Sequence, residues 1–368
     1  MIVFAILTVI HVSIFLYLTY AWESIHIFKN QEHSSRRVTV IVPVRNESGN
    51  IRNVLRDLAK QSYDKSCFDF IIVDDDSDDD TRQIAEDELS KTNSNGIVLS
   101  LEHGSGKKAA VTYALEKATG EIILCTDGDC RLPLNWISTY TSFFDKYNPK
   151  MVSGPVKMDS KSWFTQYQAL DFTSLIGFGA ATLTKGMAST CNGANMAYLR
   201  EVFFEVGGYN GNLNVPSGDD EFLLLKVFRK YPSDVHFIKS PEVIVTTQPK
   251  TSLLAFIQQR IRWSTKWRFH YNLWLRLMAV FTFFDFMSLF LLVFLMLSGK
   301  FPWLLGLGIL GIRWLSECFY LHKAASFLEL KTGRFFYPVV SLFYPFFLLF
   351  LGFASIFGYY SWKGRKYG

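Results

Sequence analysis

The chain has 368 residues, of which 49% are apolar, with a formal net charge of +5 and five cysteines. The length fits one large domain or two ordinary ones. The cysteines are scattered, odd in number and form no C-x-x-C pair, which argues against a disulfide framework or a zinc site and favours reduced thiols. The long apolar runs lie in residues 1–22 and about 273–360, which is typical of a membrane protein with a globular middle.

Residues 1–22 are apolar for the length of a membrane crossing. They lack the basic start and the small-residue cleavage site of a signal peptide, so we expect an uncleaved anchor over residues 1–23. Lys29, Arg36 and Arg37 follow this segment, and the positive-inside rule then predicts that the next domain is cytoplasmic.

Strands and helices alternate in the next hundred residues. Apolar runs predict strands over 38–44, 70–73, 96–101 and 122–125. Helical periodicity predicts helices over 51–60, 79–91 and 109–118. The alternation predicts an α/β domain with an open, mostly parallel sheet. Further along, we expect a strand over 151–156 and a long helix over 163–183.

Polar residues follow each of these strands, at the sheet edge where ligands bind in open α/β folds. They are Asn46, Asp74 to Asp76, His103 to Lys107, and Asp127 to Asp129. In the last group Gly128 lets the backbone bend, so two carboxylates can face one Mg²⁺ or Mn²⁺ ion. The alternative is an ordinary acidic turn. Neither a P-loop nor an EF-hand is present, because the spacing of both motifs is absent.

Two later segments are also candidates for a site. Residues 190–197 form a loop of small residues, including Asn195, that would let a ligand approach the backbone. Asp219, Asp220 and Glu221 precede a predicted helix over 222–228. These carboxylates either cap the helix and complement its dipole, or supply a general base near the metal.

A helical stretch over about 252–275 combines arginines, among them Arg260, with tryptophans and other aromatic residues. This composition before an apolar segment favours a helix at the membrane surface, while Gln259, Arg262 and Trp263 could also face a site. Nucleic acid is a weaker interpretation because a membrane segment follows directly.

Three apolar spans are predicted near 277–298, 303–321 and 335–360. Arg313, Glu317 and His322 in or next to the second span are expected to pair, to lie at an interface or to touch a polar headgroup. If the domain after the first anchor is cytoplasmic, three further crossings leave the basic tail on the opposite side of the membrane. This placement contradicts the positive-inside rule. Either one span is re-entrant or interfacial, with the proline-containing last span the candidate, or the tail is an exception.

Six motifs in one order resemble the membrane-integrated branch of the family 2 glycosyltransferases. This branch includes ceramide glucosyltransferases and the cellulose, chitin, hyaluronan and poly-N-acetylglucosamine synthases. The resemblance covers about residues 36–275. The motifs are Pro43-x-x-Asn46-Glu47, Val73-Asp74-Asp75-x-Ser77, Gly106-Lys107-x-x-Ala110, Asp127-x-Asp129, Gly218-Asp219-Asp220-Glu221 and Gln259-x-x-Arg262-Trp263. The fifth motif has Asp219 where the family usually has Glu, which leaves Asp220 as the matching base.

The resemblance implies a Rossmann-like GT-A fold for a cytosolic domain over 36–250. It implies an interfacial helix over 251–275, a membrane region of about three spans over 276–360 and a basic tail over 361–368. It also implies roles for individual residues. Asp220 would be the catalytic base, and Asp127 and Asp129 would hold Mg²⁺ or Mn²⁺. The donor would be bound by Pro43, Asn46, Glu47, Asp74, Asp75, Lys107, Asp127 and Arg262. The acceptor or diphosphate would be contacted by Asp219, Asn195, Gln259, Arg262 and Trp263.

The implied function is inverting transfer of a sugar from a nucleoside-diphosphate sugar, UDP-glucose or UDP-N-acetylglucosamine, to a membrane lipid. The alternative is a processive polysaccharide synthase of the poly-N-acetylglucosamine type, and a more distant one is a non-catalytic membrane scaffold that binds sugar nucleotides. The expected partners are the donor, a lipid or glycan acceptor and membrane lipids, without nucleic acid. The expected location is the bacterial inner membrane with a cytoplasmic catalytic domain.

Overall fold

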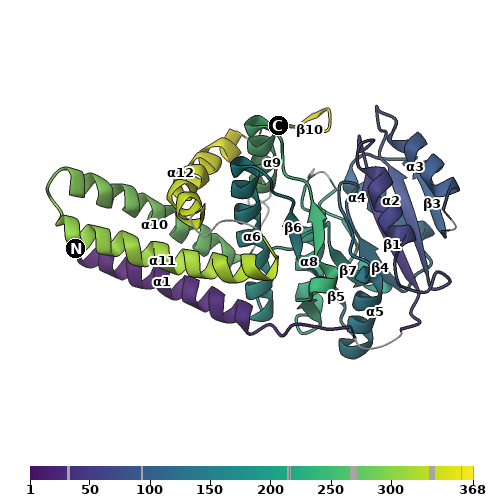
Figure 1. The fold of residues 1–368 in the computed structure, drawn as a ribbon, viewed down its shortest axis with the longest axis horizontal. Helices are drawn as coiled ribbons and strands as arrows, with labels where there is room; N and C mark the ends of the chain where they lie inside the picture. The colour runs from purple at the N-terminus through teal and green to yellow at the C-terminus, as the bar shows by residue number, and fades with distance from the viewer. Residues whose placement is uncertain are drawn as a thin grey trace. The chain divides into compact units, whose positions relative to one another are not determined.

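The computed structural model describes residues 1–30, 34–92, 94–213, 215, 217–265, 272–330, 336–357 and 359–367 (Figure 1). The chain divides into two compact units. One comprises residues 1–24, 162–177 and 250–368, and the other comprises residues 25–161 and 178–249. Each unit is described by itself.

The unit formed by residues 25–161 and 178–249 is built on a seven-stranded sheet in the order β3-β2-β1-β4-β7-β5-β8. Its strands are β1 (Val38–Val44), β2 (Phe68–Asp74), β3 (Gly96–Ser100), β4 (Ile122–Cys125), β5 (Met151–Ser153), β7 (Met196–Leu199) and β8 (Val235–Phe237). β3, β2, β1 and β4 are parallel, as are β5 and β8, whereas β7 is antiparallel to both neighbours. β1 is buried along its whole length, as expected for a strand of a parallel sheet covered on both faces. The prediction of a mostly parallel α/β sheet is confirmed.

Helices connect these strands. The same unit also contains a second sheet of two strands. The helices are α2 (Ile51–Ala59), α3 (Thr81–Ser90), α4 (Lys107–Lys117), α5 (Trp136–Tyr147), α7 (Arg200–Glu205), α8 (Asp219–Lys230) and the short 3₁₀ helix η1 (Pro241–Val243). The second sheet pairs β6 (Val156–Met158) with β9 (Val245–Thr247). α8 begins three residues earlier than predicted, so its first turn contains all three carboxylates.

The predicted strand over 151–156 is wrong, because this segment forms β5 and β6, which belong to different sheets. Gly154 and Pro155 separate them. A proline lacks the N–H of a ladder hydrogen bond. A Cβ at Gly154 would lie 2.2 Å from the hydroxyl of Tyr140 and 2.5 Å from the amide of Asn195, so only glycine fits here.

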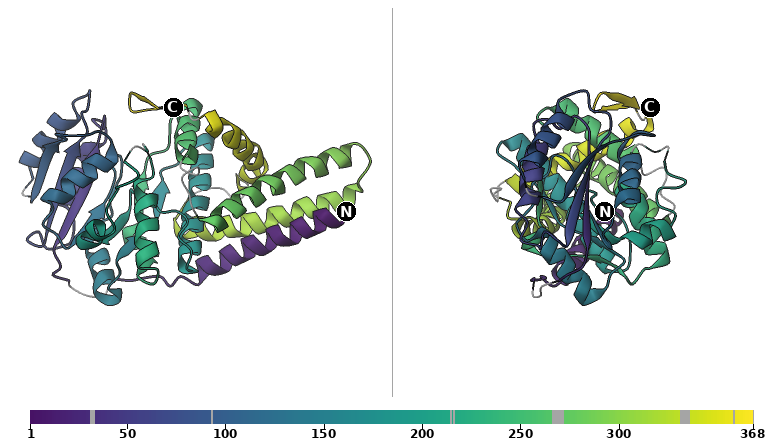
Figure 2. Two further views of the ribbon diagram at one scale, coloured as in Figure 1. Left: turned by 180° about the vertical axis from the view of Figure 1, so that it is seen from behind. Right: turned by 90° about the vertical axis from the view of Figure 1, so that its right-hand side faces the viewer.

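The other unit consists mainly of long helices (Figure 2). They are α1 (Ile2–Glu23), α9 (Leu253–Ser264), α10 (Leu273–Leu297), α11 (Trp303–Phe327) and α12 (Phe336–Phe357), followed by the hairpin β10 (Tyr360–Trp362) and β11 (Arg365–Tyr367). α6 (Trp163–Thr184) contributes residues to both units. Within the predicted helix over 252–275, α9 ends at Ser264 and α10 begins at Leu273, while residues 266–271 lie outside the described residues.

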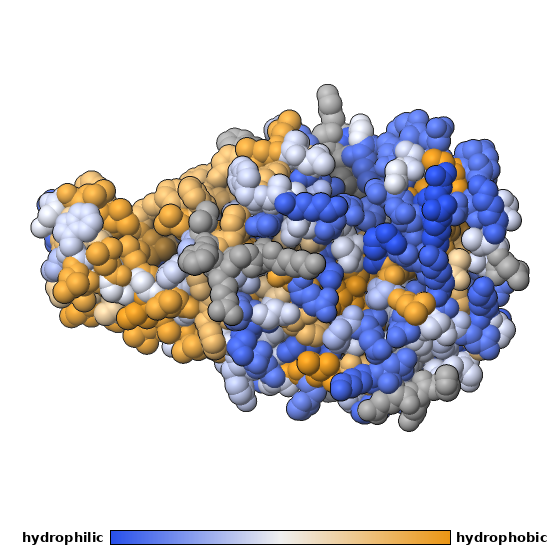
Figure 3. All heavy atoms as spheres, in the orientation of Figure 1, coloured by the Kyte–Doolittle hydropathy of each residue, from blue (hydrophilic) through white to orange (hydrophobic). Residues whose placement is uncertain are grey.

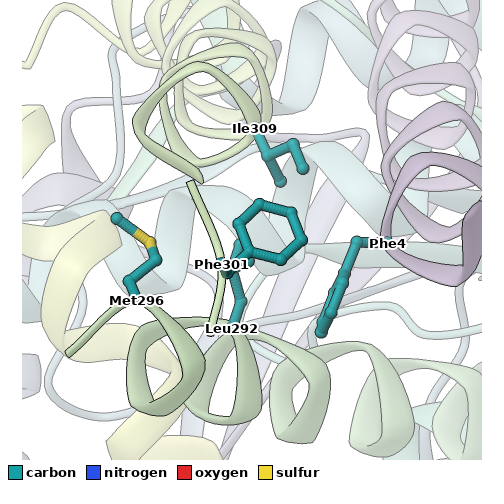
Figure 4. Close-up of a cluster of buried hydrophobic side chains, with 5 residues drawn as sticks. All are labelled: Phe4, Leu292, Met296, Phe301 and Ile309. Carbon is teal, nitrogen blue, oxygen red and sulfur yellow. The ribbon is translucent and has the colours of Figure 1, made fainter. Parts of the chain in front are cut away.

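In the part of the chain that the structure describes, four helices, α1, α10, α11 and α12, are long and apolar enough to cross a membrane. α1 and α11 lie side by side (Figure 1 and the left view of Figure 2), and apolar side chains cover the face of this bundle that Figure 3 shows. A buried cluster of Phe4, Leu292, Met296, Phe301 and Ile309 packs α1 against α10 and α11 (Figure 4). These helices support membrane association.

A polar network connects the same four helices within their apolar surroundings. The imidazole of His11 on α1 lies 2.9 Å from the carboxylate of Asp285 on α10 and 3.2 Å from that of Glu317 on α11. Arg313 forms an ion pair with Asp285, and the hydroxyl of Ser341 on α12 donates to Glu317. The pairing expected of Arg313 and Glu317 is therefore present.

Candidate active site

The candidate site is built on the carboxyl ends of β2, β1 and β4, which are neighbours in the sheet. Parallel strands end at one edge, so the loops that follow them are brought together there. These loops carry Asn46 and Glu47 after β1, Asp75 to Asp78 after β2, and Asp127 to Asp129 after β4. This is the edge at which the sequence predicted a ligand.

Arg45 joins the loops after β1 and β2. Its guanidinium donates to the carbonyl oxygen of Asp75 at 2.7 Å and to the carboxylate of Asp78 at 2.9 Å. The side-chain oxygen of Asn46 accepts from the backbone N–H of Asp78 at 2.8 Å. The backbone N–H of Asn46 donates to the hydroxyl of Ser77 at 2.9 Å. The two loops thus form one hydrogen-bonded structure. Motif matching missed Arg45 and Asp78, and their opposite charges were the only signal in the sequence.

Four of the residues predicted to bind the donor are buried at this edge of the sheet. They are Pro43, Glu47, Asp74 and Asp75. Both oxygens of the Asp75 carboxylate accept from the N–H of Gly106 at 2.9 Å, and Asp74 accepts from the N–H of Ser77 at 3.2 Å. Glu47 accepts from the amide of Asn50 at 2.8 Å, while Pro43 lies inside β1. In this conformation Asp74 and Asp75 therefore hold the backbone of the loops, and their direct contact with a donor stays a prediction.

Lys107, at the first position of α4, lies between two carboxylates. Its ammonium donates to Asp127 at 2.6 Å and is 3.2 Å from an oxygen of Asp219. Burial by itself would lower the pKa of Lys107, but the charges of Asp127 and Asp219 outweigh it and hold this pKa well above its usual value. The site therefore contains a fixed positive charge. Because Asp219 and Asp127 come from α8 and from the loop after β4, Lys107 brings three predicted residues together.

Gly193 allows this close approach. A Cβ at position 193 would lie 2.8 Å from the ammonium nitrogen of Lys107, 3.1 Å from an oxygen of Asp219 and 3.4 Å from the Cβ of Asp220. The N–H of Gly193 also donates to the carboxylate of Asp220 at 3.0 Å. The small-residue loop was predicted to admit a ligand, and the structure shows that it also admits Lys107 and orients Asp220.

Asn195 does not fit the acceptor-binding role that the resemblance implied. Its side chain is fully buried. Its amide nitrogen donates to two backbone carbonyls at 2.8 and 2.7 Å, and its oxygen accepts from Trp136 at 2.9 Å and Tyr140 at 2.9 Å. All four hydrogen-bonding positions of the amide are used inside the protein, so Asn195 stabilises the core beneath the site.

Asp127 and Asp129, predicted to hold a divalent cation, lie on either side of Gly128 in the loop after β4. A Cβ at Gly128 would lie 2.8 Å from Val44 and 3.1 Å from Glu47, so the turn between the two carboxylates requires glycine. In the described part of the chain no three His, Cys, Asp or Glu side chains form a metal cluster. Two carboxylates suit an Mg²⁺ or Mn²⁺ ion that takes its remaining ligands from phosphate and water.

Lys108 holds the segment that precedes α8. Its buried ammonium donates to the carbonyl oxygens of Asn212 and Val215, both at 2.7 Å, and of Ser217 at 3.1 Å. Lys226 on α8 donates to the carbonyls of Gly208 and Asn210, also at 2.7 Å. The sequence analysis missed both lysines, because a lysine that binds backbone carbonyls has no sequence signature.

The motif residues Gln259, Arg262 and Trp263 are half-buried on α9, in the unit of long helices. Arg260, one of the basic residues of the predicted interfacial helix, is buried in an ion pair with Asp171 of α6. Its guanidinium lies 4.3 Å from the ring centre of Trp263 and 4.9 Å from that of Phe256. The interfacial role predicted for the helix over 251–275 stays a prediction, and the structure adds that Arg260 is buried with a carboxylate partner that the sequence could not identify.

Residues 39–207, which contain the sheet edge and Lys107, match the sequence profile of Glycosyl transferase family 2. The chain carries a family 2 glycosyltransferase domain. The predicted resemblance and the GT-A type of mostly parallel sheet are thereby confirmed.

Two curated relatives and one solved structure illustrate the similarity. The glycosyltransferase AglE of Haloferax volcanii is 28% identical over 182 residues, which are 50% of this chain and 58% of AglE. The poly-beta-1,6-N-acetyl-D-glucosamine synthase of Staphylococcus aureus is 24% identical over 184 residues, 48% of this chain and 42% of the synthase. The chain thus spans about half the length of these relatives.

The solved structure is the mannosyltransferase PcManGT of Pyrobaculum calidifontis, in complex with GDP-Man and Mn²⁺. The comparison covers 96% of this chain and 97% of PcManGT, with a TM-score of 0.57 and 18% identity. At this identity the likeness concerns the fold.

Proposed function

We propose that this glycosyltransferase moves a sugar from a nucleoside-diphosphate sugar to a membrane lipid with inversion at the anomeric carbon. The observation that carries the proposal is the grouping of Lys107, Asp127, Asp219 and Asp220 at the carboxyl edge of the sheet of a family 2 domain. This grouping combines a positive charge for the leaving group with a carboxylate for the acceptor.

The leaving group of the reaction is a nucleoside diphosphate, whose pyrophosphate gains negative charge as the sugar departs. Lys107 would supply an ammonium that its contact with Asp127 already holds in place. A positive charge that is oriented before the reaction stabilises developing negative charge strongly. A divalent cation held by Asp127 and Asp129 would neutralise further charge on the phosphates. In the structure the Lys107 ammonium donates to Asp127.

The acceptor hydroxyl is a poor nucleophile until it loses its proton. Asp220 would accept this proton on a carboxylate oxygen as the hydroxyl oxygen attacks the anomeric carbon and the bond to the diphosphate breaks. One oxygen of Asp220 is fixed by the N–H of Gly193 and the other accepts from the N–H of Glu221. These two contacts fix the orientation of the carboxylate, as a positioned general base requires.

The membrane helices favour a lipid acceptor. Four helices are a small number for one chain to enclose a polysaccharide channel, and α9 carries the motif residues Gln259, Arg262 and Trp263 directly before α10. The alternative is a processive synthase, as the name of the Staphylococcus aureus relative suggests. For the donor we propose UDP-glucose or UDP-N-acetylglucosamine. For the location we propose a bacterial inner membrane with a cytoplasmic catalytic domain, and the positive residues after α1 support this orientation.

The test uses detergent-purified full-length protein with Mg²⁺ or Mn²⁺, a total lipid extract and a panel of donors that includes GDP-mannose. Nucleoside diphosphate release is measured and products are identified by mass spectrometry. A lipid with one or two added sugars supports the proposal, and a ladder of long glycans supports the synthase. Absence of release with every donor and either metal would contradict both and favour the binding scaffold.

Asp220→Asn is the decisive variant, because asparagine keeps the shape and loses the base. We expect kcat to fall by ~10²–10⁴-fold with donor affinity retained, as measured by release rate and by donor titration. Asp87→Asn, at an exposed position on α3, is the matched control and should leave the rate unchanged. Near-normal turnover of Asp220→Asn would refute its assignment as the base.

A further inference from the structure

The last candidate membrane helix presents a conflict between composition and contacts. α9 precedes α10, α11 and α12, and the hairpin β10–β11 follows them. If all three helices crossed the membrane, α9 and the hairpin would lie on opposite sides, separated by a hydrocarbon core of about 30 Å. Yet Tyr360 of β10, Ile261 of α9 and Leu351 of α12 form one buried apolar cluster. At least one of the three helices therefore does not cross.

α1, α10 and α11 have the contacts of crossing helices. At one end of their bundle Phe4 of α1 packs against Phe301, in the turn between α10 and α11, with ring centres 5.5 Å apart. At the other end Lys323 of α11 lies 3.3 Å from Glu23 of α1. The helices have 22, 25 and 25 residues, which at about 1.5 Å per residue is enough to span the hydrocarbon core.

α12 begins and ends at the same end of this bundle, the end marked by Glu23 and Lys323. Near its start Tyr337 contacts His322 of α11, with ring centres 6.1 Å apart. Past Pro345, Phe347 stacks on Phe256 of α9 at 5.2 Å with an angle of 11° between the rings. α9 itself directly precedes α10, whose far end carries Met296 of the Phe4 cluster. Both ends of α12 thus lie on the α9 side.

The outer face of α12 is apolar and exposed. Phe343, Phe346, Phe350 and Phe353 recur at intervals of three and four residues, each between 48% and 61% exposed, and one edge of the stripe reaches α10, where Phe346 packs edge-on against Phe290 with ring centres 4.6 Å apart. Such a stripe on one face of a helix fits the acyl region of a single leaflet, while the opposite face packs on protein. Lys363 and Arg365 in the following hairpin then meet lipid headgroups of the same leaflet.

We propose that α12 does not cross the membrane but lies embedded in the leaflet on the α9 side, with its stripe of four phenylalanines in contact with lipid chains. Within the described residues three helices then cross, namely α1, α10 and α11. This arrangement also places the basic tail on the side of α9, in agreement with the positive-inside rule.

The test is site-specific labelling of the full-length protein with a membrane-impermeant maleimide. Cysteines are introduced singly by Lys300→Cys in the α10–α11 turn and by Glu329→Cys before α12, both at exposed positions, and by one cysteine added after Gly368. Native Cys67 reports the side of the glycosyltransferase domain. Intact cells and inside-out vesicles are labelled in parallel, and modified peptides are located by mass spectrometry.

We expect position 329, the added cysteine and Cys67 to be labelled in inside-out vesicles and to lose labelling in intact cells, with position 300 showing the opposite. Labelling of the added cysteine together with position 300 would overturn the proposal and establish a fourth crossing. A green fluorescent protein fused after Gly368 of the unaltered chain provides a second measurement. Fluorescence supports the proposal, and a non-fluorescent but membrane-inserted fusion contradicts it. Neither readout depends on catalysis.

Discussion

Single residues at the sheet edge decide which chemistry the domain can perform. Lys107 is held between Asp127 and Asp219, and Gly193 leaves the space for its ammonium. A charge fixed in this way requires little rearrangement when negative charge develops on a leaving group. The backbone N–H of Gly193 orients the carboxylate of Asp220, the residue that we propose as the base.

Lys107→Met should remove most of the catalytic charge stabilisation while keeping the bulk of the side chain. Loss of one such group typically lowers kcat by ~10²–10³-fold, and we expect this loss in donor turnover. Lys117→Met, at an exposed position on the same helix, is the matched control. A Lys107→Met enzyme that turned over like the control would show that Lys107 only pairs with the carboxylates.

Gly193→Ala tests the space at the same point. The added methyl group would lie 2.8 Å from the Lys107 ammonium, which is the mobile end of a side chain and can shift. We therefore expect lower kcat with little change in thermal stability. Gly49→Ala, where a Cβ would meet nothing within 4 Å, should change neither quantity. A large fall in stability for Gly193→Ala would show that the backbone, not Lys107, is displaced.

Elements are held together by buried charges that the sequence pattern does not reveal. The Asp171–Arg260 pair connects α6 and α9, and the Arg260 guanidinium covers the Trp263 ring. Two charges removed from water stabilise an interface only when each satisfies the other. This pair therefore determines how α9 presents its motif residues.

Asp171→Asn should destabilise the helical unit, because it leaves the charge of Arg260 buried without its carboxylate. Breaking a buried pair typically costs about 3–5 kcal/mol, measurable as a lower melting temperature in detergent. Lys323→Met breaks the more exposed pair with Glu23 and should cost about 0–1 kcal/mol. The double variant Asp171→Leu, Arg260→Met should be more stable than Asp171→Asn. Equal melting temperatures for Asp171→Asn and Lys323→Met would contradict the structural role.

At the scale of the whole molecule, the membrane helices are joined by one polar network. His11, Asp285, Arg313, Glu317 and Ser341 come from α1, α10, α11 and α12, so each helix contributes to it. Apolar packing within a membrane gives little preference for one helix register over another. Paired charges give a strong preference, because both partners must meet. The network therefore specifies how these helices assemble.

Asp285 and Arg313 offer a double-mutant cycle on this network. We expect Asp285→Asn and Arg313→Gln each to lower the melting temperature, and the double variant to lose less than the sum. The coupling free energy should be about 1 kcal/mol, within the range for polar contacts between membrane helices. Thr282→Val, which removes only a hydroxyl bonded within α10, is the control. Strict additivity would show that the pair does not specify helix assembly.

The sequence by itself determined the parallel core strands, the strand-end position of Asp127 and Asp129, the carboxylates at the start of α8 and the four apolar helices. These features depend on local composition and periodicity, because buried strands and membrane helices require continuous apolar residues. From the charge of the tail, it also indicated that either one apolar segment does not cross the membrane, with the last one the candidate, or the tail is an exception to the positive-inside rule.

Only the tertiary structure decided which polar side chains are used inside the protein. Asn195 belongs to a motif-like loop, yet four hydrogen bonds hold it in the core. Arg260 belongs to the predicted interfacial helix, and it pairs with Asp171, 89 positions earlier in the chain. The contact of Tyr360 with Ile261 reveals on which side the chain returns. Such pairings join residues distant in sequence, and a local pattern contains no information about a partner that folding alone brings near.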